Sequence, residues 1–234
     1  SIYGAGIYIK DAYSNSGFII SNLNISGNHG ATGNGSPSSE FWGAGIYIDQ
    51  SIGTINGTTI EQNGICSAEV GINSCKRPKY GGGIYVSNFS SVDMNNVDIN
   101  NNYIYDSPTQ HGTGNAIYFD RATNCHLNYV NIDNSNLVPQ DDEEVNIGRG
   151  IYISNSTSIE FQHVIITGNS DYGIRSESSH DIQLRYTEIT DNGIGIWSKN
   201  STNYNIQNLT MANNVWGITS NNSKSTSKRK VNGK

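Results

Sequence analysis

The chain repeats one frame seven times, in which two pairs of alternating apolar residues are separated by two residues and followed by an Asn. Apolar residues two apart are typical of short strands that turn one side inward, and nothing recurs at the helical period of about 3.6 residues. The copies are Phe18/Ile20/Leu23/Ile25/Asn28, Gly53/Ile55/Thr58/Ile60/Asn63, Val92/Met94/Val97/Ile99/Asn102, Cys125/Leu127/Val130/Ile132/Ser135, Ile159/Phe161/Val164/Ile166/Asn169, Ile182/Leu184/Thr187/Ile189/Asn192 and Tyr204/Ile206/Leu209/Met211/Asn214. The frame therefore predicts a stack of strands.

A tetrad of the Gly-Ile-x-Ile type precedes each frame and supplies a third strand per repeat. The tetrads begin at Gly6, Gly45, Gly83, Ala116, Gly150, Gly173, Gly195 and Gly217. Their spacing is 22 to 23 residues in the last three steps and 33 to 39 in the first four, so the bare coil has about 22 residues. Periods in this range mark solenoids. We expect an all-β fold, a single-stranded parallel β-helix of about eight rungs, with four long loops leaving from one corner of the first half.

Two polar columns are expected at the corners of the coil. The Asn column should hydrogen-bond from coil to coil and tolerate left-handed backbone angles, which gives it a structural role. A second, small-residue column is predicted at Ala12, Ser51, Phe89, Ala122, Ser156, Ser179, Ser201 and Ser223.

Composition predicts one elongated domain over residues 1–223, which we expect to be part of a longer chain or assembly, and a basic polar tail over 224–234, disordered or of artificial origin. The net charge is −6, but the tail holds five of the 14 basic residues, so the rod itself carries about −11. Such a rod should not bind nucleic acid, because phosphate binding relies on basic side chains. No apolar run is long enough for a transmembrane segment.

The four loops span residues 29–43, 64–81, 103–114 and 136–148, all between the Asn position and the next tetrad. Stacking should gather them on one side of the rod, and loops on a rigid scaffold commonly carry function. Their candidate residues are Trp42, Tyr80, Tyr105 and His111 for a glycan or partner face, and Asp141, Asp142, Glu143 and Glu144 for metal or acid/base chemistry. Alternatively the loops only thicken and stabilise the rod.

The outward residue of each tetrad forms a further column. It reads Tyr8, Tyr47, Tyr85, Tyr118, Tyr152, Arg175, Trp197 and Thr219. Aromatic residues on adjacent strands stabilise a sheet by stacking, which is one interpretation. The other is a flat aromatic strip for sugar rings or a partner, with Arg175 stacked as a cation or binding a carboxylate.

Asp93, His126 and Glu160 occupy equivalent outward positions of consecutive frames. At the strand spacing of roughly 5 Å they could bind a metal ion, Ca²⁺ being allowed, or act as acid and base. The alternative is an ordinary exposed ladder of alternating charges.

Cys66 and Cys75 lie in one loop with eight residues between them, whereas Cys125 occupies an inward position of the frame. We expect a Cys66–Cys75 disulfide, which would indicate an oxidising compartment.

The tetrad Gly150-Ile151-Tyr152-Ile153, followed by Thr167-Gly168-Asn169, resembles the right-handed parallel β-helix repeats of the pectate-lyase-like superfamily. The Gly43-Ala44-Gly45-Ile46 and Gly81-Gly82-Gly83-Ile84 segments also resemble the repeats of surface proteins such as polymorphic membrane proteins. The first resemblance implies lyase, epimerase or hydrolase chemistry on polysaccharides, and the second implies adhesion or architecture. The chain has no Tyr-Gly-Phe-Asp-Pro-His-like epimerase motif and no dense Asp pair within a frame strand.

We therefore expect a non-catalytic extracellular or surface β-helix with a structural or adhesive role, in a filament or adhesin. It would need no cofactor, present its loops and aromatic face to a glycan or protein partner, and associate end to end. The alternative is a polysaccharide lyase or epimerase, with or without Ca²⁺, whose cleft lies between the loops and the Tyr column.

Overall fold

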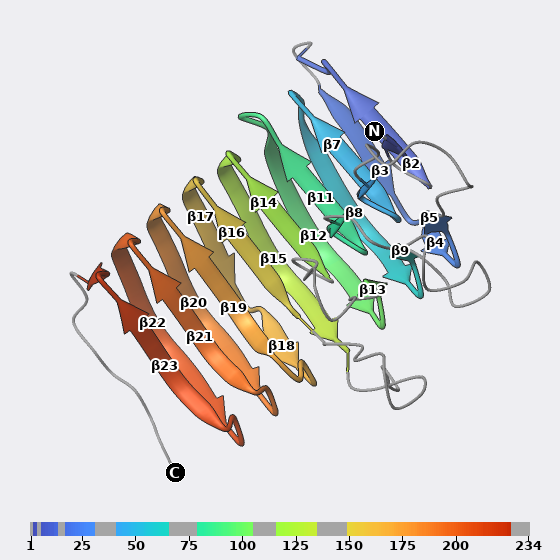
Figure 1. Cartoon of the computed structure of the whole chain (residues 1–234). Helices are drawn as coiled ribbons and strands as arrows, with labels where there is room; N and C mark the ends of the chain where they lie inside the picture. Colours follow the sequence, from blue (N-terminus) through green and yellow to red (C-terminus); the bar gives the residue numbers. More distant parts are fainter. Residues whose placement is uncertain are drawn as a thin grey trace.

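The computed structural model describes residues 2–3, 6–13, 17–30, 41–65, 79–104, 116–134 and 149–225. All regular structure in these ranges is β-strand, and every strand pair is parallel. Figure 1 shows the coils stacked side by side as a rod that runs from the N-terminal to the C-terminal end. The predicted parallel β-helix is thus confirmed, because each strand pairs with its counterpart in the next coil rather than with its neighbour in sequence.

The tetrads form one eight-stranded sheet, here the tetrad sheet. Its strands are β2 (Ile7–Lys10), β7 (Ile46–Asp49), β11 (Ile84–Ser87), β14 (Ile117–Asp120), β16 (Ile151–Ser154), β19 (Tyr172–Glu177), β21 (Ile194–Lys199) and β23 (Trp216–Asn221).

The frames form a ten-stranded sheet, here the frame sheet. Its strands are β3 (Phe18–Ser21), β4 (Asn24–Ser26), β8 (Ile52–Glu61), β12 (Ser91–Asn100), β15 (Thr123–Asp133), β17 (Thr157–Gln162), β18 (Ile165–Thr167), β20 (His180–Thr190), β22 (Thr202–Ala212) and β24 (Lys224–Ser225). In most coils the two expected frame strands are one continuous strand, bent at a residue with positive φ. These residues form the bend column, Asn22, Gly57, Asn96, Tyr129, His163, Tyr186 and Asn208.

Two small sheets flank the loop corner, one where the first three loops leave and one where the first two loops return beside residues 2–3. Their strands are β5 (His29–Gly30), β9 (Gly64–Ile65) and β13 (Tyr103–Ile104) on the leaving side, and β1 (Ile2–Tyr3), β6 (Phe41–Trp42) and β10 (Lys79–Tyr80) on the returning side. The first three loops therefore share one corner, as predicted. At the other end β24 pairs with β22, so regular structure continues two residues into the expected tail.

The inward columns fill the core between the two sheets. Ile46, Ile55 and Ile99 are fully buried, as are Phe119 and Phe161. Like side chains of successive coils pack directly on one another, with Ile60 beside Ile99 and Ile99 beside Ile132. Burying such columns is the main stabilising term for a solenoid, because each coil covers the apolar side of the next.

The Asn column forms the expected hydrogen-bonded corner. Asn28 donates through Nδ2 to Asn63 Oδ1 at 2.8 Å, Asn63 to Asn102 at 3.0 Å and Asn169 to Asn192 at 2.8 Å. The expected left-handed φ at the Asn itself is wrong, since it belongs to the preceding residue, such as Gln62.

The fourth coil departs from the predicted frame, because Asn134 and not Ser135 stands in the Asn column, where its Nδ2 donates to Asn169 Oδ1 at 2.8 Å. Ile132 is followed there by Asp133 and then Asn134, so the turn lacks the positive-φ residue that other coils have. The regular spacing of the frame does not show that this turn is one residue shorter than the others.

The second corner is a column of hydroxyls that accept from the backbone of the neighbouring coil. Ser51 N donates to Ser90 Oγ at 3.1 Å, and Ser156 N donates to Ser179 Oγ at 3.2 Å. The column contains Ser90 where Phe89 was predicted. Asn88 and Phe89 both have positive φ, so this turn holds one extra residue and Phe89 points outward with 70% of its surface exposed.

Candidate functional site

The outward face of the tetrad sheet carries two parallel columns of side chains. The aromatic column is the predicted one, and its register from Tyr8 to Thr219 is confirmed strand by strand. Two positions later runs a polar column, Lys10, Asp49, Ser87, Asp120, Ser154, Glu177, Lys199 and Asn221. Both columns lie on the outside of the coil because the residue between them points into the core.

The tyrosines of the aromatic column pack on one another along the rod, stacked in three pairs and edge to face between Tyr85 and Tyr118. Ring centroids are 5.2 Å apart for Tyr8 and Tyr47, 5.1 Å for Tyr47 and Tyr85, and 4.8 Å for Tyr118 and Tyr152. Tyr47, Tyr85, Tyr118 and Tyr152 are at most 8% exposed, and only Tyr8 is open, at 45%. The expectation of a flat exposed strip is therefore wrong for four of the five tyrosines, because stacking buries the ring faces.

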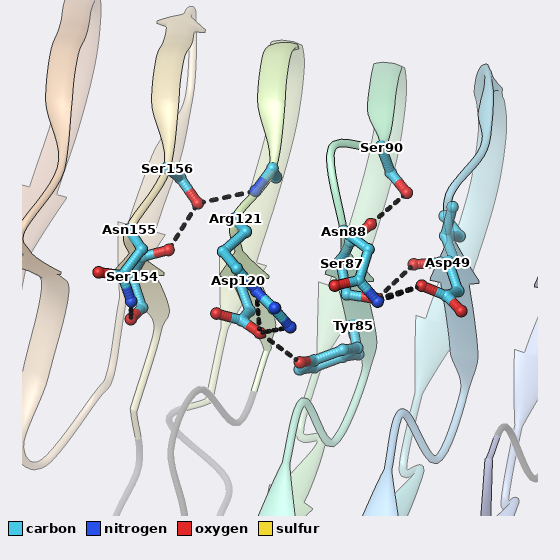
Figure 2. A network of polar contacts seen from close by, with 12 residues as sticks. Asp49, Tyr85, Ser87, Asn88, Ser90, Asp120, Arg121, Ser154, Asn155 and Ser156 are labelled. Atoms are coloured by element: carbon cyan, nitrogen blue, oxygen red, sulfur yellow. Dashed lines mark hydrogen bonds and ion pairs between the residues drawn. The ribbon is translucent and has the colours of Figure 1, made fainter.

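A polar network joins the tyrosine hydroxyls to the polar column (Figure 2). Tyr85 donates to Asp120 Oδ2 at 3.1 Å, and Arg121 binds the same oxygen through Nη2 at 3.1 Å. Burial, followed by the nearby Asp120 carboxylate, raises the pKa of Tyr85 far above its ordinary value. This phenol consequently stays protonated at physiological pH.

Asp49 on β7 is likewise fixed by hydrogen bonds from the adjacent coil. Its Oδ1 accepts from Asn88 Nδ2 at 2.6 Å and from Ser87 Oγ at 3.1 Å. The carboxylate is only 8% exposed. Figure 2 shows Ser87, the last residue of β11, and the following Asn88 turned toward Asp49 of β7.

A pocket of about 210 Å³ opens above this network. It is lined by Tyr8, Lys10, Tyr47, Asp49, Tyr85, Asn88 and Arg121. Lys10 is exposed and the Arg121 side chain is 52% exposed, so two cations border the opening. The volume is below the range of about 300 to 1,000 Å³ typical of drug-sized ligands, which fits one small ring rather than an enclosed chain.

Arg175 continues the aromatic column and is enclosed by three rings. Its guanidinium carbon lies 5.1 Å from the Tyr152 centroid, 5.5 Å from that of Tyr172 and 4.6 Å from that of Trp197. Glu177 on the same strand accepts from its Nε at 2.8 Å. Arg175 therefore has both predicted roles at once: it is a cation stacked on aromatic rings, and it binds a carboxylate of the same chain.

The predicted column Asp93, His126 and Glu160 is confirmed as a register on the frame sheet. His126 Nδ1 and Asp93 Oδ1 are 2.7 Å apart, and about half of each side chain is exposed. Glu160 instead pairs with Arg185 Nη1 at 3.0 Å. Within the described ranges, no three His, Cys, Asp or Glu side chains are grouped so that they could hold one metal ion.

Several predicted residues lie outside the described residues. These are Cys66, Cys75, Tyr105, His111, Asp141, Asp142, Glu143 and Glu144. For Trp42 and Tyr80 the structure gives the backbone, which places them opposite each other on β6 and β10. The loop part of the candidate site thus stays a prediction.

Sequence reasoning missed two outward columns. The polar column could have been found two residues after each tetrad tyrosine, and the bend column within the two-residue gap of each frame. The bend column holds three stacked rings, with centroids 4.8 Å apart for Tyr129 and His163 and 4.9 Å apart for His163 and Tyr186.

The stacked parallel coils and the outward columns define the class of the protein, a β-helix whose inward side chains fill the core and whose sheet faces carry columns of outward side chains. The sequence matches the model of the right handed beta helix region over residues 82–233, which is more than half of the chain. The chain belongs to this family. No curated protein matches it.

Two solved structures are similar in coil architecture. A proposed glycosyl hydrolase from Parabacteroides merdae has 9% sequence identity and a TM-score of 0.45, over 75% of this chain and 82% of that one. The periplasmic alginate epimerase AlgG has 10% identity and a TM-score of 0.35, over 80% of this chain and 61% of that one. Such likenesses concern the coil alone.

In the part of the chain that is described, no helix is long and apolar enough to cross a membrane.

Proposed function

We propose that this protein is a non-catalytic β-helix of the cell surface or extracellular space that binds a glycan on its tetrad face. The observation that carries the proposal is the pocket bordered by Tyr8, Lys10 and Arg121. An open aromatic ring and nearby polar groups suit the apolar face and hydroxyls of a sugar. Because two cations border the opening, we propose an acidic sugar, whose carboxylate would accept charge-assisted hydrogen bonds.

The chemistry of the pocket favours binding over catalysis. Asp49 and Asp120 are both committed to hydrogen bonds with neighbouring coils. Tyr85 stays protonated because burial raises its pKa, so it is a poor base. A lyase or epimerase needs a group that removes a proton from the sugar, and Asp49, Asp120 and Tyr85 do not suit this role.

The binding proposal can be tested with variants that keep the local backbone preferences. Arg121 occupies a positive-φ corner where Asn88, Asn155 and Asn200 stand in other coils, so Arg121→Asn should fold normally. Lys10→Gln removes the second cation, and Lys199→Gln, in the same column at the far end, is the matched control. Titration calorimetry with uronic acid oligosaccharides should show roughly tenfold weaker binding for each pocket variant, since a charge-assisted hydrogen bond contributes about 1.5 to 3 kcal/mol.

If both pocket variants bound uronic acid oligosaccharides with unchanged affinity, or if the natural chain bound none, the glycan proposal would be wrong. The enzymatic alternative is tested separately by the absorbance of unsaturated products from uronate polymers, with and without Ca²⁺. Turnover that disappears in His126→Gln would instead identify the pair of Asp93 and His126 as acid/base machinery.

A further inference from the structure

The bend column of the frame sheet changes character in three consecutive coils. Four of its seven members are Asn or Gly, the residues that adopt positive φ most readily. Tyr129, His163 and Tyr186 have φ of 53°, 52° and 50°, a conformation that bulky side chains rarely adopt. Strained backbone of this kind persists where the surroundings or a function require it.

The three rings are stacked but not hidden. Their planes differ by 4° between Tyr129 and His163 and by 10° between His163 and Tyr186. Tyr129 is 56% exposed and Tyr186 is 54% exposed, in contrast to the buried tyrosines of the tetrad face. Packing alone therefore explains this stack less well than it explains the aromatic column.

The geometry of the stack determines how a ligand can meet it. Because the rings lie face to face along the rod, a ligand cannot enter between them and must approach one of the exposed end rings, Tyr129 or Tyr186. A flat apolar surface, such as one face of a sugar ring, can extend the stack at either end.

A row of planar polar side chains precedes the stack, namely Asn128, Gln162 and Arg185. Asn128 Oδ1 and Arg185 Nε are shielded from solvent and have no hydrogen-bond partner. They flank Gln162, which is exposed. Because the orphaned acceptor and the orphaned donor lie two strands apart, they match two different hydroxyl groups of one ligand, one that donates and one that accepts.

The charges around the stack exclude an acidic ligand. Asp98 and Glu188 are exposed two residues after the bend, on β12 and β20. Asp93 lies on the same sheet, and the Arg185 guanidinium is already paired with Glu160. A neutral hydroxyl-rich molecule avoids both the repulsion and the cost of desolvating a second ion.

We propose that the stack of Tyr129, His163 and Tyr186, together with Asn128, Gln162 and Arg185, is a binding site for neutral oligosaccharides. A sugar ring packs on an exposed end tyrosine, and its hydroxyls bind the exposed Gln162 amide and, when that side chain shifts, the orphaned atoms of Asn128 and Arg185 on either side of it. This site lies on the frame sheet, apart from the pocket of Lys10 and Arg121, so the two proposals can fail independently.

The test replaces the rings by the residue that other coils use. The double variant Tyr129→Asn/Tyr186→Asn restores Asn to the bend column and should fold at least as well as the natural chain, whereas Tyr186→Phe keeps the ring. Asn22→Gly, three coils before Tyr129 in the same column, is the control. The probes are hexasaccharides of glucose, mannose, galactose and N-acetylglucosamine in titration calorimetry.

We expect at least one hexasaccharide to bind the natural chain. Its Kd should rise at least tenfold in the double variant and about threefold or more in Gln162→Ala, while Tyr186→Phe and Asn22→Gly stay within twofold. The Lys10→Gln variant should bind the same hexasaccharide normally. Absence of binding to all four probes, or equal affinity of a folded double variant, overturns the proposal.

Discussion

Asn134 donates through Nδ2 to Asn169 Oδ1 at 2.8 Å, although the turn that carries Asn134 is one residue shorter than its equivalents. Its own Oδ1 is buried and accepts no hydrogen bond within the described residues. The column thus tolerates a deletion at one turn, because the remaining donor still bridges to the next coil. The coils on either side have fuller hydrogen bonding.

This difference predicts unequal effects along the Asn column. Asn192 donates to Asn214 and Ile166 and accepts from Asn169, so Asn192→Ala leaves several buried groups unpaired. We expect it to lower the free energy of unfolding by about 2 to 3 kcal/mol. Asn134→Ala should cost about 1 kcal/mol, and Asn24→Ala, at an exposed position of β4, should cost less, as measured by urea denaturation. Equal losses for Asn192→Ala and Asn24→Ala would contradict a structural role for the column.

The Gly that begins most tetrads packs closely against the next coil. A Cβ on Gly45 would lie 2.5 Å from the carbonyl oxygen of Gly83, whereas a Cβ on Gly217 in the last coil would meet no atom within 4 Å. Gly45→Ala should therefore destabilise the protein by about 3 kcal/mol, and Gly217→Ala by less than about 0.5 kcal/mol. Thermal melts followed by circular dichroism compare the two, and a stable Gly45→Ala chain would show that the coils separate easily.

The buried tyrosines predict a loss of stability in alkali. Burial, with a smaller contribution from Glu177, raises the pKa of Tyr152 from 10.0 to about 12. The unfolded chain then releases this proton at lower pH than the folded chain, so stability is complete below pH 10 and falls as pH rises from 10 to 12. In Tyr152→Phe the midpoint of thermal unfolding should fall less steeply over this window. Parallel curves for both chains would argue against the raised pKa.

The cysteines offer a test of the predicted disulfide. Cys125 is buried in the core, and burial raises the pKa of its thiol to about 12, so it should not react with thiol reagents in the folded chain. If Cys66 and Cys75 form a bridge, the oxidised protein should release no thiol when folded and one when unfolded without reductant. Three thiols on unfolding would show that the bridge is absent. The Cys66→Ser/Cys75→Ser chain isolates Cys125 as a reporter of unfolding.

Much of the architecture could be predicted because the frame records which residues point inward. Columns such as Ile60, Ile99 and Ile132 follow from alternation alone, and the Asn column follows from the need to satisfy buried corners. The errors fall where a turn gains or loses one residue, at Phe89 and at Ser135. A local pattern contains no information on which residue of an irregular turn meets the coil above it.

The sequence by itself determined the coil, its two corner columns and the register of the tyrosines from Tyr8 to Tyr152. Only the tertiary structure decided that most of these rings are buried while Tyr129 and Tyr186 stay open. The physical reason is that exposure depends on contacts between coils about 22 to 39 residues apart in the chain, and not on the alternation within one strand. The same contacts commit Asp49 and Asp120 to neighbouring coils and leave Lys10 and Arg121 at the opening of the pocket.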